Sequence, residues 1–241
     1  MIRFEKVTRR LGGRLVLDAV DLEIQKGETF VIVGSSGAGK SVTLKHMVRL
    51  LTPDSGRVWV GDDVVSEARG RDLERIRSRF GVLFQGAALL QWLNVGDNVA
   101  LPLREHTNMS EEEIDRLVEE KLRLVNLEDV MDKFPANLSG GMRKRVGLAR
   151  AIIRSPEIIL YDEPTSGLDP VSTMRIEEML RRLKAEYTIV LVTNNTKQAA
   201  RVADRTAFFL DGELVEVGDT VKIFSVPSDP RTNDYILGRF G

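Results

Sequence analysis

The chain has 241 residues, of which 42% are hydrophobic and 29% charged, and its formal net charge is -1. This length fits one large domain or two associated subdomains, and the balanced charge argues against a broad basic face for nucleic acid. There is no cysteine, which excludes disulfides and cysteine-based metal sites, and the two histidines, His46 and His106, are too few for a histidine-rich metal site.

No apolar run approaches the roughly 20 residues needed to span a bilayer. The first residues include an acidic side chain, Glu5, and lack the apolar core of a signal peptide. We therefore expect a soluble, cytoplasmic protein that reaches a membrane only through a partner.

The first third of the chain predicts strands followed by a helix. Residues 16–24 alternate apolar and polar side chains, as in a half-buried strand. Residues 29–33 are almost wholly apolar and β-branched, which predicts a strand covered on both faces. This strand leads into a glycine-rich loop and a predicted helix over residues 42–51.

The middle of the chain changes to a helical pattern. Ser110 is a predicted N-cap, followed by acidic residues at 111–113 and by apolar side chains at 114, 117, 118, 122 and 125. Further buried strands are predicted over residues 158–161 and 188–193. Alternating strands and helices imply an α/β fold with a mostly parallel core sheet, and the helical stretch is an insert within it.

The glycine-rich loop matches the phosphate-binding P-loop pattern, with a buried strand before it and a helix after it. Its residues are Gly34, Ser35, Ser36, Gly37, Ala38, Gly39, Lys40 and Ser41. The glycines allow successive N–H groups to point at one anion, and the helix start adds its positive dipole end. Lys40 is predicted to hold the β- and γ-phosphates of a nucleotide and Ser41 to ligate Mg²⁺.

A P-loop alone leaves kinases, GTPases, helicases and transport ATPases open. Two acids, Asp162 and Glu163, end the apolar strand over residues 158–161. Beside a P-loop this arrangement is typical of a Walker B motif, with Asp162 in the Mg²⁺ shell and Glu163 as the general base that polarises water. By itself the pair is equally compatible with a solvated strand end.

A second set of close-approach N–H donors follows Ser139, at Gly140 and Gly141. A helix N-terminus of this kind is a second phosphate-binding end. One chain cannot easily direct two such ends at one nucleotide, whereas two chains arranged head to tail can complete each other's sites.

Residues 138–142 and the basic helix after them resemble the LSGGQ signature of the ABC ATPase family. Gln85 matches the family's Q-loop, and Asp169 matches its D-loop. The resemblance covers essentially the whole chain and implies a single ABC ATPase domain over residues 1–241. It further implies that residues 1–84 and 151–241 form a RecA-like core with an N-terminal antiparallel β part and that residues 85–150 form the helical insert.

The resemblance also implies function. It implies that two copies of the chain would sandwich two ATP molecules and drive transmembrane permease subunits from the inner face of the cell membrane. By the same resemblance, Gln85 is expected to contribute to both the Mg²⁺ shell and catalysis, and Val42 and Asp169 are expected to join the nucleotide-binding residues.

Three positions depart from the family pattern. Met142 replaces the signature glutamine, which we expect to be tolerated because Ser139 and backbone N–H groups carry the phosphate contact. Asn194 occupies the position of the catalytic switch histidine and cannot carry a positive charge. We therefore expect slower basal hydrolysis, with ATP binding and dimer closure retained.

Residues 8–16 lack the usual adenine-stacking aromatic, so Leu11 or an arginine is expected to cover the base.

The segments disagree about the transported substrate. Residues 84–107 and Met142 resemble the ATPase of Mla-type, MCE-linked phospholipid transporters, whereas residues 198–204 and 234–241 resemble the phosphate-import ATPase. Family precedent places the Q-loop and insert against the permease, so we favour phospholipid transport with an MCE-domain partner, and phosphate import is the alternative. In residues 87–93, Trp92 is expected to anchor a permease contact, the alternative being a buried core segment.

Two classes compete with a transport ATPase. Soluble ABC ATPases of translation or DNA repair usually carry tandem cassettes, long coiled coils or zinc insertions, which this sequence lacks. A small-molecule kinase would leave residues 138–142 and the Gln85 loop without a purpose.

Overall fold

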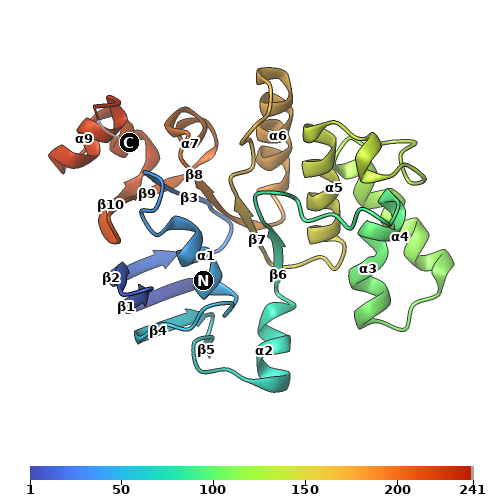
Figure 1. Cartoon of the computed structure of the whole chain (residues 1–241), viewed down its shortest axis with the longest axis horizontal. Coiled ribbons are helices and arrows are strands. Elements are labelled where there is room, and N and C mark those ends of the chain that lie inside the picture. Colours follow the sequence, from blue (N-terminus) through green and yellow to red (C-terminus); the bar gives the residue numbers. More distant parts are fainter. Residues whose placement is uncertain (240–241) are drawn as a thin grey trace. The chain divides into compact units, whose positions relative to one another are not determined.

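The computed structural model describes residues 1–239 and divides the chain into two compact units. The first comprises residues 1–77 and 184–241, and the second comprises residues 78–183 (Figure 1). Phe240 and Gly241, the end of the segment that resembles the phosphate-import ATPase, lie outside the described residues. In the part of the chain that the model describes, no helix is long and apolar enough to cross a membrane.

The first unit contains an antiparallel sheet with the strand order β2-β1-β4-β5. Its strands are β1 (Ile2–Leu11), β2 (Arg14–Ile24), β4 (Ser55–Val60) and β5 (Asp63–Val64). The predicted alternation in β2 breaks at Ala19, whose φ is 44°, where the β1–β2 register shifts. Because this irregularity re-aims the side chains, both Leu17 and Val20 are buried.

The same unit contains the strand sequence β10-β9-β3-β8. These strands are β3 (Thr29–Gly34), β8 (Thr188–Thr193), β9 (Arg205–Leu210) and β10 (Glu213–Asp219). Strand β3 is parallel to both β8 and β9, and β10 pairs antiparallel with β9. Every residue of β3 and β8 is buried, which is why their sequences are almost continuously apolar.

The helix after the P-loop differs from the predicted span of residues 42–51. Helix α1 runs over Lys40–Met47, so it begins inside the loop motif, directly after Gly39. It ends early because Arg49 adopts a left-handed conformation, with φ 52°, and the N–H of Leu50 returns to the carbonyl of Lys45. The other helices of this unit are α2 (Gly70–Arg77), α7 (Thr196–Val202), α8 (Thr220–Ser225) and α9 (Pro230–Ile236).

The second unit joins a parallel strand pair to a group of helices. Strands β6 (Phe80–Leu83) and β7 (Ile158–Asp162) pair in parallel. The helices are α3 (Val95–His106), α4 (Glu111–Leu124), the 3-10 turn η1 (Pro135–Asn137), α5 (Gly140–Ile152) and α6 (Pro170–Leu183). Figure 1 shows α3, α4 and α5 side by side. The capping box predicted at Ser110 is present, with Glu113 as the reciprocal partner.

These elements confirm the predicted α/β fold class, with parallel strands, an N-terminal antiparallel β part and a helical segment. The finer division into a core of residues 1–84 and 151–241 and an insert of residues 85–150 stays a prediction.

Candidate functional site

The P-loop between β3 and α1 requires glycine at two positions. Gly34 has φ 155° and Gly39 has φ 104°. A Cβ atom on Gly34 would lie 2.2 Å from the carbonyl oxygen of Phe209, and one on Gly39 would lie 2.5 Å from that of Val16. Neither neighbour can give way easily because both are backbone atoms, so only glycine fits this cradle.

Lys40 is the first residue of α1 and is 7% exposed. Its Nζ donates to the carbonyl oxygens of Gly34 and Ser35, at 2.8 and 2.9 Å. These bonds hold the ammonium against the loop that precedes it. The N-cap residue of α1 is Gly39, which has no side chain to cap the helix. No side chain at this position therefore competes with an anion for the N–H groups of the first turn.

A cavity of about 300 Å³ opens beside this loop. It is lined by Arg14, Val16, Gly37, Gly39, Lys40, Ser41 and Val42. The donors, the buried lysine and the glycine cradle fit the phosphates of a nucleotide. Arg14 lines this cavity, and the choice between Leu11 and an arginine as the cover of the base stays a prediction.

Asn194 follows β8 and is exposed. Val33 of β3 pairs with Thr193 of β8, so the P-loop and Asn194 leave neighbouring parallel strands at the same edge. The turn after Asn194 is fixed locally: the N–H of Asn195 donates to Thr193 Oγ1 at 3.1 Å, and Asn195 Oδ1 accepts from the N–H of Gln198 at 3.0 Å. The structure therefore brings the switch position to the phosphate-loop edge of the first unit.

In the second unit, the predicted metal and catalytic residues share one strand edge. Leu83 of β6 pairs with Tyr161 of β7, so Gln85 lies beyond the end of one strand as Asp162 ends the other. Gln85 is exposed, and Asp162 is 8% exposed. The strand pairing therefore brings Gln85 and Asp162 to the same edge of this strand pair.

Glu163 adopts a left-handed backbone conformation, with φ 50°. This conformation is costly for a residue with a side chain and marks a constrained position. Lys144 of α5 donates from Nζ to the carbonyl oxygen of Glu163 at 2.7 Å. Burial lowers the pKa of Lys144, and the charges of Glu163 and Asp162 oppose this shift.

Ser139 is the N-cap of α5 and accepts from the N–H of Met142 at 3.2 Å. A Cβ on Gly141 would lie 3.1 Å from Ser172, so the second glycine permits close packing. Asp169 accepts from the N–H groups of Val171 and Ser172, both at 2.9 Å. Its hydrogen bonds with Ser172 lower its pKa, so this carboxyl stays ionised.

Sequence reasoning missed several residues that shape these loops. Lys144 lay unremarked within a basic run, and Tyr235 carried no local signal because its hydroxyl contacts a residue 41 positions away. Arg150 donates to the carbonyls of Ala87 and Ala88, and Asn98 bonds the backbone of residues 90–94. Only three-dimensional contacts show these roles.

The strand, glycine loop and helix, together with a strand that ends in paired acids, define a P-loop nucleotide-binding protein. Residues 17–166 match the family model described as "ABC transporter". The chain therefore belongs to the ABC transporter family and is an ATP-binding subunit of that family.

Two curated relatives carry different transport names. The "Probable ribonucleotide transport ATP-binding protein mkl" of Mycobacterium leprae is 41% identical over 99% of this chain and 69% of its own length. "Phosphate import ATP-binding protein PstB 3" of Streptococcus pneumoniae is 39% identical over 95% of each chain.

The ATP-binding cassette MJ0796, solved as a dimer in a post-hydrolysis state with ADP and Pi, superposes with a TM-score of 0.83. It is 32% identical, over 91% of this chain and 99% of that chain.

Proposed function

We propose that this chain is the ATP-hydrolysing subunit of a membrane transporter and that it works as a head-to-tail pair around two ATP molecules. The glycine cradle with buried Lys40 carries the ATP-binding part of this proposal. The dimeric relative MJ0796 supports the pairing. The exposed cap of α5, with Ser139 at its start, supplies the second phosphate-binding end that a partner copy needs.

Each predicted site residue has a role in this proposal. Residues 34–42 bind the phosphates and contact the nucleotide, and Ser139, Gly140, Gly141 and Asp169 act on the nucleotide of the partner copy. Ser41, Asp162 and Gln85 provide oxygen ligands of the kind that Mg²⁺ prefers. Glu163 is the general base, and Gln85 and Asn194 assist at the reacting phosphate.

Bound ATP and Mg²⁺ supply the scissile phosphoanhydride and the neutralising charge, and the chain supplies positioning. The ammonium of Lys40 lies against the carbonyls of Gly34 and Ser35, within the loop that would hold the phosphates. Glu163 requires a fixed orientation to accept a proton from water, and its constrained backbone provides one. Release of inorganic phosphate from ATP without an added acceptor distinguishes this hydrolase from a small-molecule kinase.

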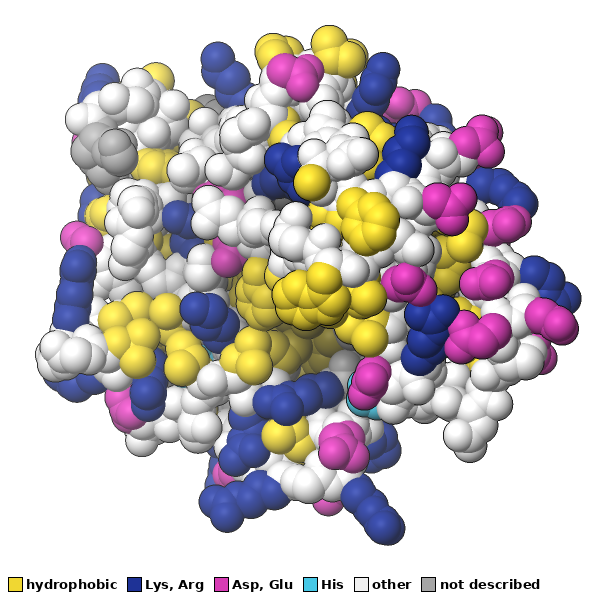
Figure 2. All heavy atoms as spheres, turned by 45° about the vertical axis from the view of Figure 1, so that its right-hand side comes forward, with side chains coloured by type: hydrophobic (Ala, Val, Ile, Leu, Met, Phe, Trp, Pro, Cys, Tyr) yellow, Lys and Arg dark blue, Asp and Glu magenta, His cyan; other side chains and the backbone are white. Residues whose placement is uncertain are grey.

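We further propose a permease contact on the loop between β6 and α3. Trp92 is 74% exposed, although Ala87 and Leu89 of the same segment are buried. Arg150 and Asn98 fix the backbone on either side, so the indole is presented from a rigid loop. Figure 2 shows hydrophobic side chains gathered near the middle of the face that it draws. Through this contact the chain works peripherally on the inner face of the membrane.

The proposed cargo is phospholipid, moved by an MCE-linked permease. The support is the resemblance of residues 84–107 to Mla-type ATPases, in the segment that is proposed to meet the permease. Phosphate import is the second candidate, favoured by the C-terminal resemblance and by the PstB relative. The mkl relative is named for ribonucleotide transport and adds a third cargo to test.

The test of cargo is mass spectrometry of proteins that co-purify with this chain from native membranes in mild detergent. An MCE-domain protein with a single permease type supports phospholipid transport. Two different permease chains with a phosphate-binding protein would replace that reading with phosphate import. A partner that binds nucleosides or nucleotides would instead make ribonucleotide the cargo.

A further inference from the structure

The last helix of the described chain contacts the switch position. Tyr235 of α9 is 7% exposed, and its hydroxyl donates to the carbonyl oxygen of Asn194, with 3.4 Å between the oxygens. Its ring stacks on Phe208, with centroids 4.7 Å apart and an interplanar angle of 24°. One side chain therefore contacts both the turn after β8 and strand β9.

Phe208 belongs to the strand that supports the phosphate loop. It pairs with Val33, and the next residue, Phe209, pairs with Gly34 at the loop's first position. The carbonyl of Phe209 is also the atom that a Cβ on Gly34 would strike. Tyr235 therefore packs against the same strand that shapes the start of the P-loop. Its two contacts, Phe208 and Asn194, both lie near the edge of the first unit from which the P-loop leaves.

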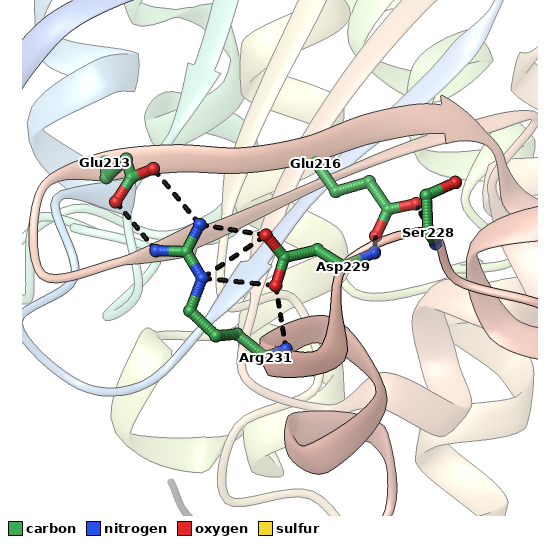
Figure 3. Close-up of polar contacts among 5 residues, drawn as sticks. All are labelled: Glu213, Glu216, Ser228, Asp229 and Arg231. Carbon is green, nitrogen blue, oxygen red and sulfur yellow. Dashed lines mark hydrogen bonds and ion pairs between the residues drawn. The ribbon is translucent and has the colours of Figure 1, made fainter.

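A charged cluster fixes the start of α9 against β10 (Figure 3). The guanidinium of Arg231 lies between two carboxylates: it donates to Glu213 at 2.8 and 3.2 Å and to Asp229 at 2.9 Å. Asp229 is also the N-cap of α9, accepting from the N–H of Arg231 at 2.8 Å. Glu216 accepts from the N–H groups of Ser228 and Asp229, at 2.8 and 3.2 Å.

These contacts hold a short helix that has little stability of its own. Exposed ion pairs contribute modestly one by one, but bidentate geometry and a shared network increase their effect. Because β10 anchors the helix at its start, the Tyr235 ring is held against Phe208 and its hydroxyl against the turn. The C-terminal segment is therefore tied to the backbone of Asn194.

We propose that Tyr235 is a positioning residue for the switch turn: its hydroxyl fixes the backbone of Asn194, and this orients the Asn194 side chain for its action at the terminal phosphate. The inference rests on the proposed function of Asn194. It assigns a role in hydrolysis to the segment over residues 228–237, which reaches the site through the fold and not through the nucleotide motifs.

The test is a double-mutant cycle on the full-length chain, measured by phosphate release from Mg²⁺-ATP. Tyr235→Phe removes only the hydroxyl and keeps the stacking on Phe208. We expect it to lower kcat about threefold and to leave the KM for ATP within about twofold, because a lost orientation acts on the chemical step. In an Asn194→Ala background, where no amide remains to be oriented, the same substitution should leave kcat unchanged.

Packing is measured separately with Tyr235→Leu, which removes the ring stacking and should lower the thermal midpoint. If Tyr235→Phe lowers kcat equally in both backgrounds, the hydroxyl does not act through Asn194 and the proposal is overturned. The same holds if Tyr235→Phe matches the wild type while Asn194→Ala is slow. If Asn194→Ala alone has no effect, the role of Asn194 and this inference fail together, whereas wild-type phosphate release separately tests the ATPase assignment.

Discussion

The ammonium of Lys144 donates to the backbone carbonyl of Glu163 at 2.7 Å, joining the signature helix α5 to the proposed general base. Glu163 is in the left-handed region, a conformation that costs on the order of 1–3 kcal/mol and persists only where its surroundings enforce it. A bond to a charged donor of this kind contributes about 1.5–3 kcal/mol, which is enough to hold such a backbone. Lys144 therefore ties helix α5 to the backbone of the proposed base.

We predict that Lys144→Met lowers kcat for ATP hydrolysis by about tenfold or more and has a smaller effect on the KM for ATP. Without the ammonium, the backbone at Glu163 can relax and misdirect the carboxylate. Steady-state phosphate release at saturating and limiting ATP separates the two parameters. The matched control is Arg145→Met on the same helix, whose guanidinium bonds the carbonyls of Val125 and Asn126. That variant should lose thermal stability and keep its kcat; similar losses of kcat in both variants would contradict the prediction.

The P-loop glycines differ in what a methyl group would meet, which gives a graded prediction. Gly39→Ala combines a φ of 104° with a Cβ 2.5 Å from the Val16 carbonyl, whereas Gly37→Ala meets only the strained φ of 81° in open space. We expect Gly39→Ala to abolish measurable ATP binding. Gly37→Ala should cost about 1 kcal/mol of backbone strain and leave weakened binding.

Equilibrium titration with a fluorescent ATP analogue measures both variants, and thermal unfolding shows whether each chain is folded. Equal affinities in the two alanine variants would show that the contact with Val16 does not shape the loop.

The sequence anticipated the elements whose signals are local. The buried strand before Gly34, the capping box at Ser110 and the strand over residues 188–193 follow from periodicity and capping chemistry, and the structure contains them. The predicted end of α1 at residue 51 is wrong because Arg49 adopts a left-handed conformation that ends the helix early. The sequence has no glycine at this position to indicate such a conformation.

Contacts between residues far apart in the chain could not be predicted from the sequence. Nothing near Tyr235 indicates that its hydroxyl meets Asn194, and nothing in the basic run around Lys144 shows which cation points at Glu163. Left-handed Ala87 and Ala88 are equally invisible in the sequence, since they are held by carbonyl bonds to Arg150. Sequence motifs identify which residues are candidates for nucleotide chemistry. Contacts between residues distant in the sequence determine how those candidates are oriented.

Acid should destabilise the chain through His46 of α1. His46 is 1% exposed; burial lowers its pKa below 6.5, and the hydrogen bond to the Val42 carbonyl opposes this. Arg9 lowers the pKa further and Asp54 raises it. Since the unfolded chain binds a proton at a higher pH than the folded chain, stability is complete above 6.5 and falls as the pH drops toward the folded value.

We expect the thermal midpoint of the wild type to fall between pH 7.5 and pH 5.5 by more than that of His46→Gln. His106→Gln is the matched control, because His106 is exposed at the end of α3 and is the other histidine of the chain. The midpoint is measured by differential scanning calorimetry in buffers of equal ionic strength. An identical acid shift in the wild type and His46→Gln would remove His46 as the cause.

The switch position gives a prediction about turnover. Asn194 can donate a hydrogen bond but cannot carry a positive charge, so we propose that basal hydrolysis is slower than a histidine would allow. Asn194→His should raise kcat, and the gain should grow as the pH falls toward 6, where more of the imidazole is charged. The assay is phosphate release from Mg²⁺-ATP across this pH range. Equal rates for the wild type and the variant would show that Asn194 does not limit basal hydrolysis.

Fluorescence of Trp92 tests the proposed permease contact. The chain has two tryptophans, and the other, Trp59, is half-buried and donates from its indole N–H to Glu5 at 2.9 Å. In a Trp59→Phe background the emission reports Trp92 alone. Because this indole is 74% exposed, we expect red-shifted emission from the isolated chain and efficient quenching by iodide.

Assembly with the permease should remove water from the indole, shift its emission to shorter wavelength and reduce quenching. The exposed Leu50, in the other unit, provides a control: Leu50→Ala should leave the spectral shift intact, whereas Trp92→Ala should weaken assembly. Truncating an interface hot spot, a class of residue in which tryptophan is enriched, costs about 2 kcal/mol or more of binding free energy. Emission from Trp92 that stays red-shifted in the assembled transporter would place the permease contact elsewhere on the chain.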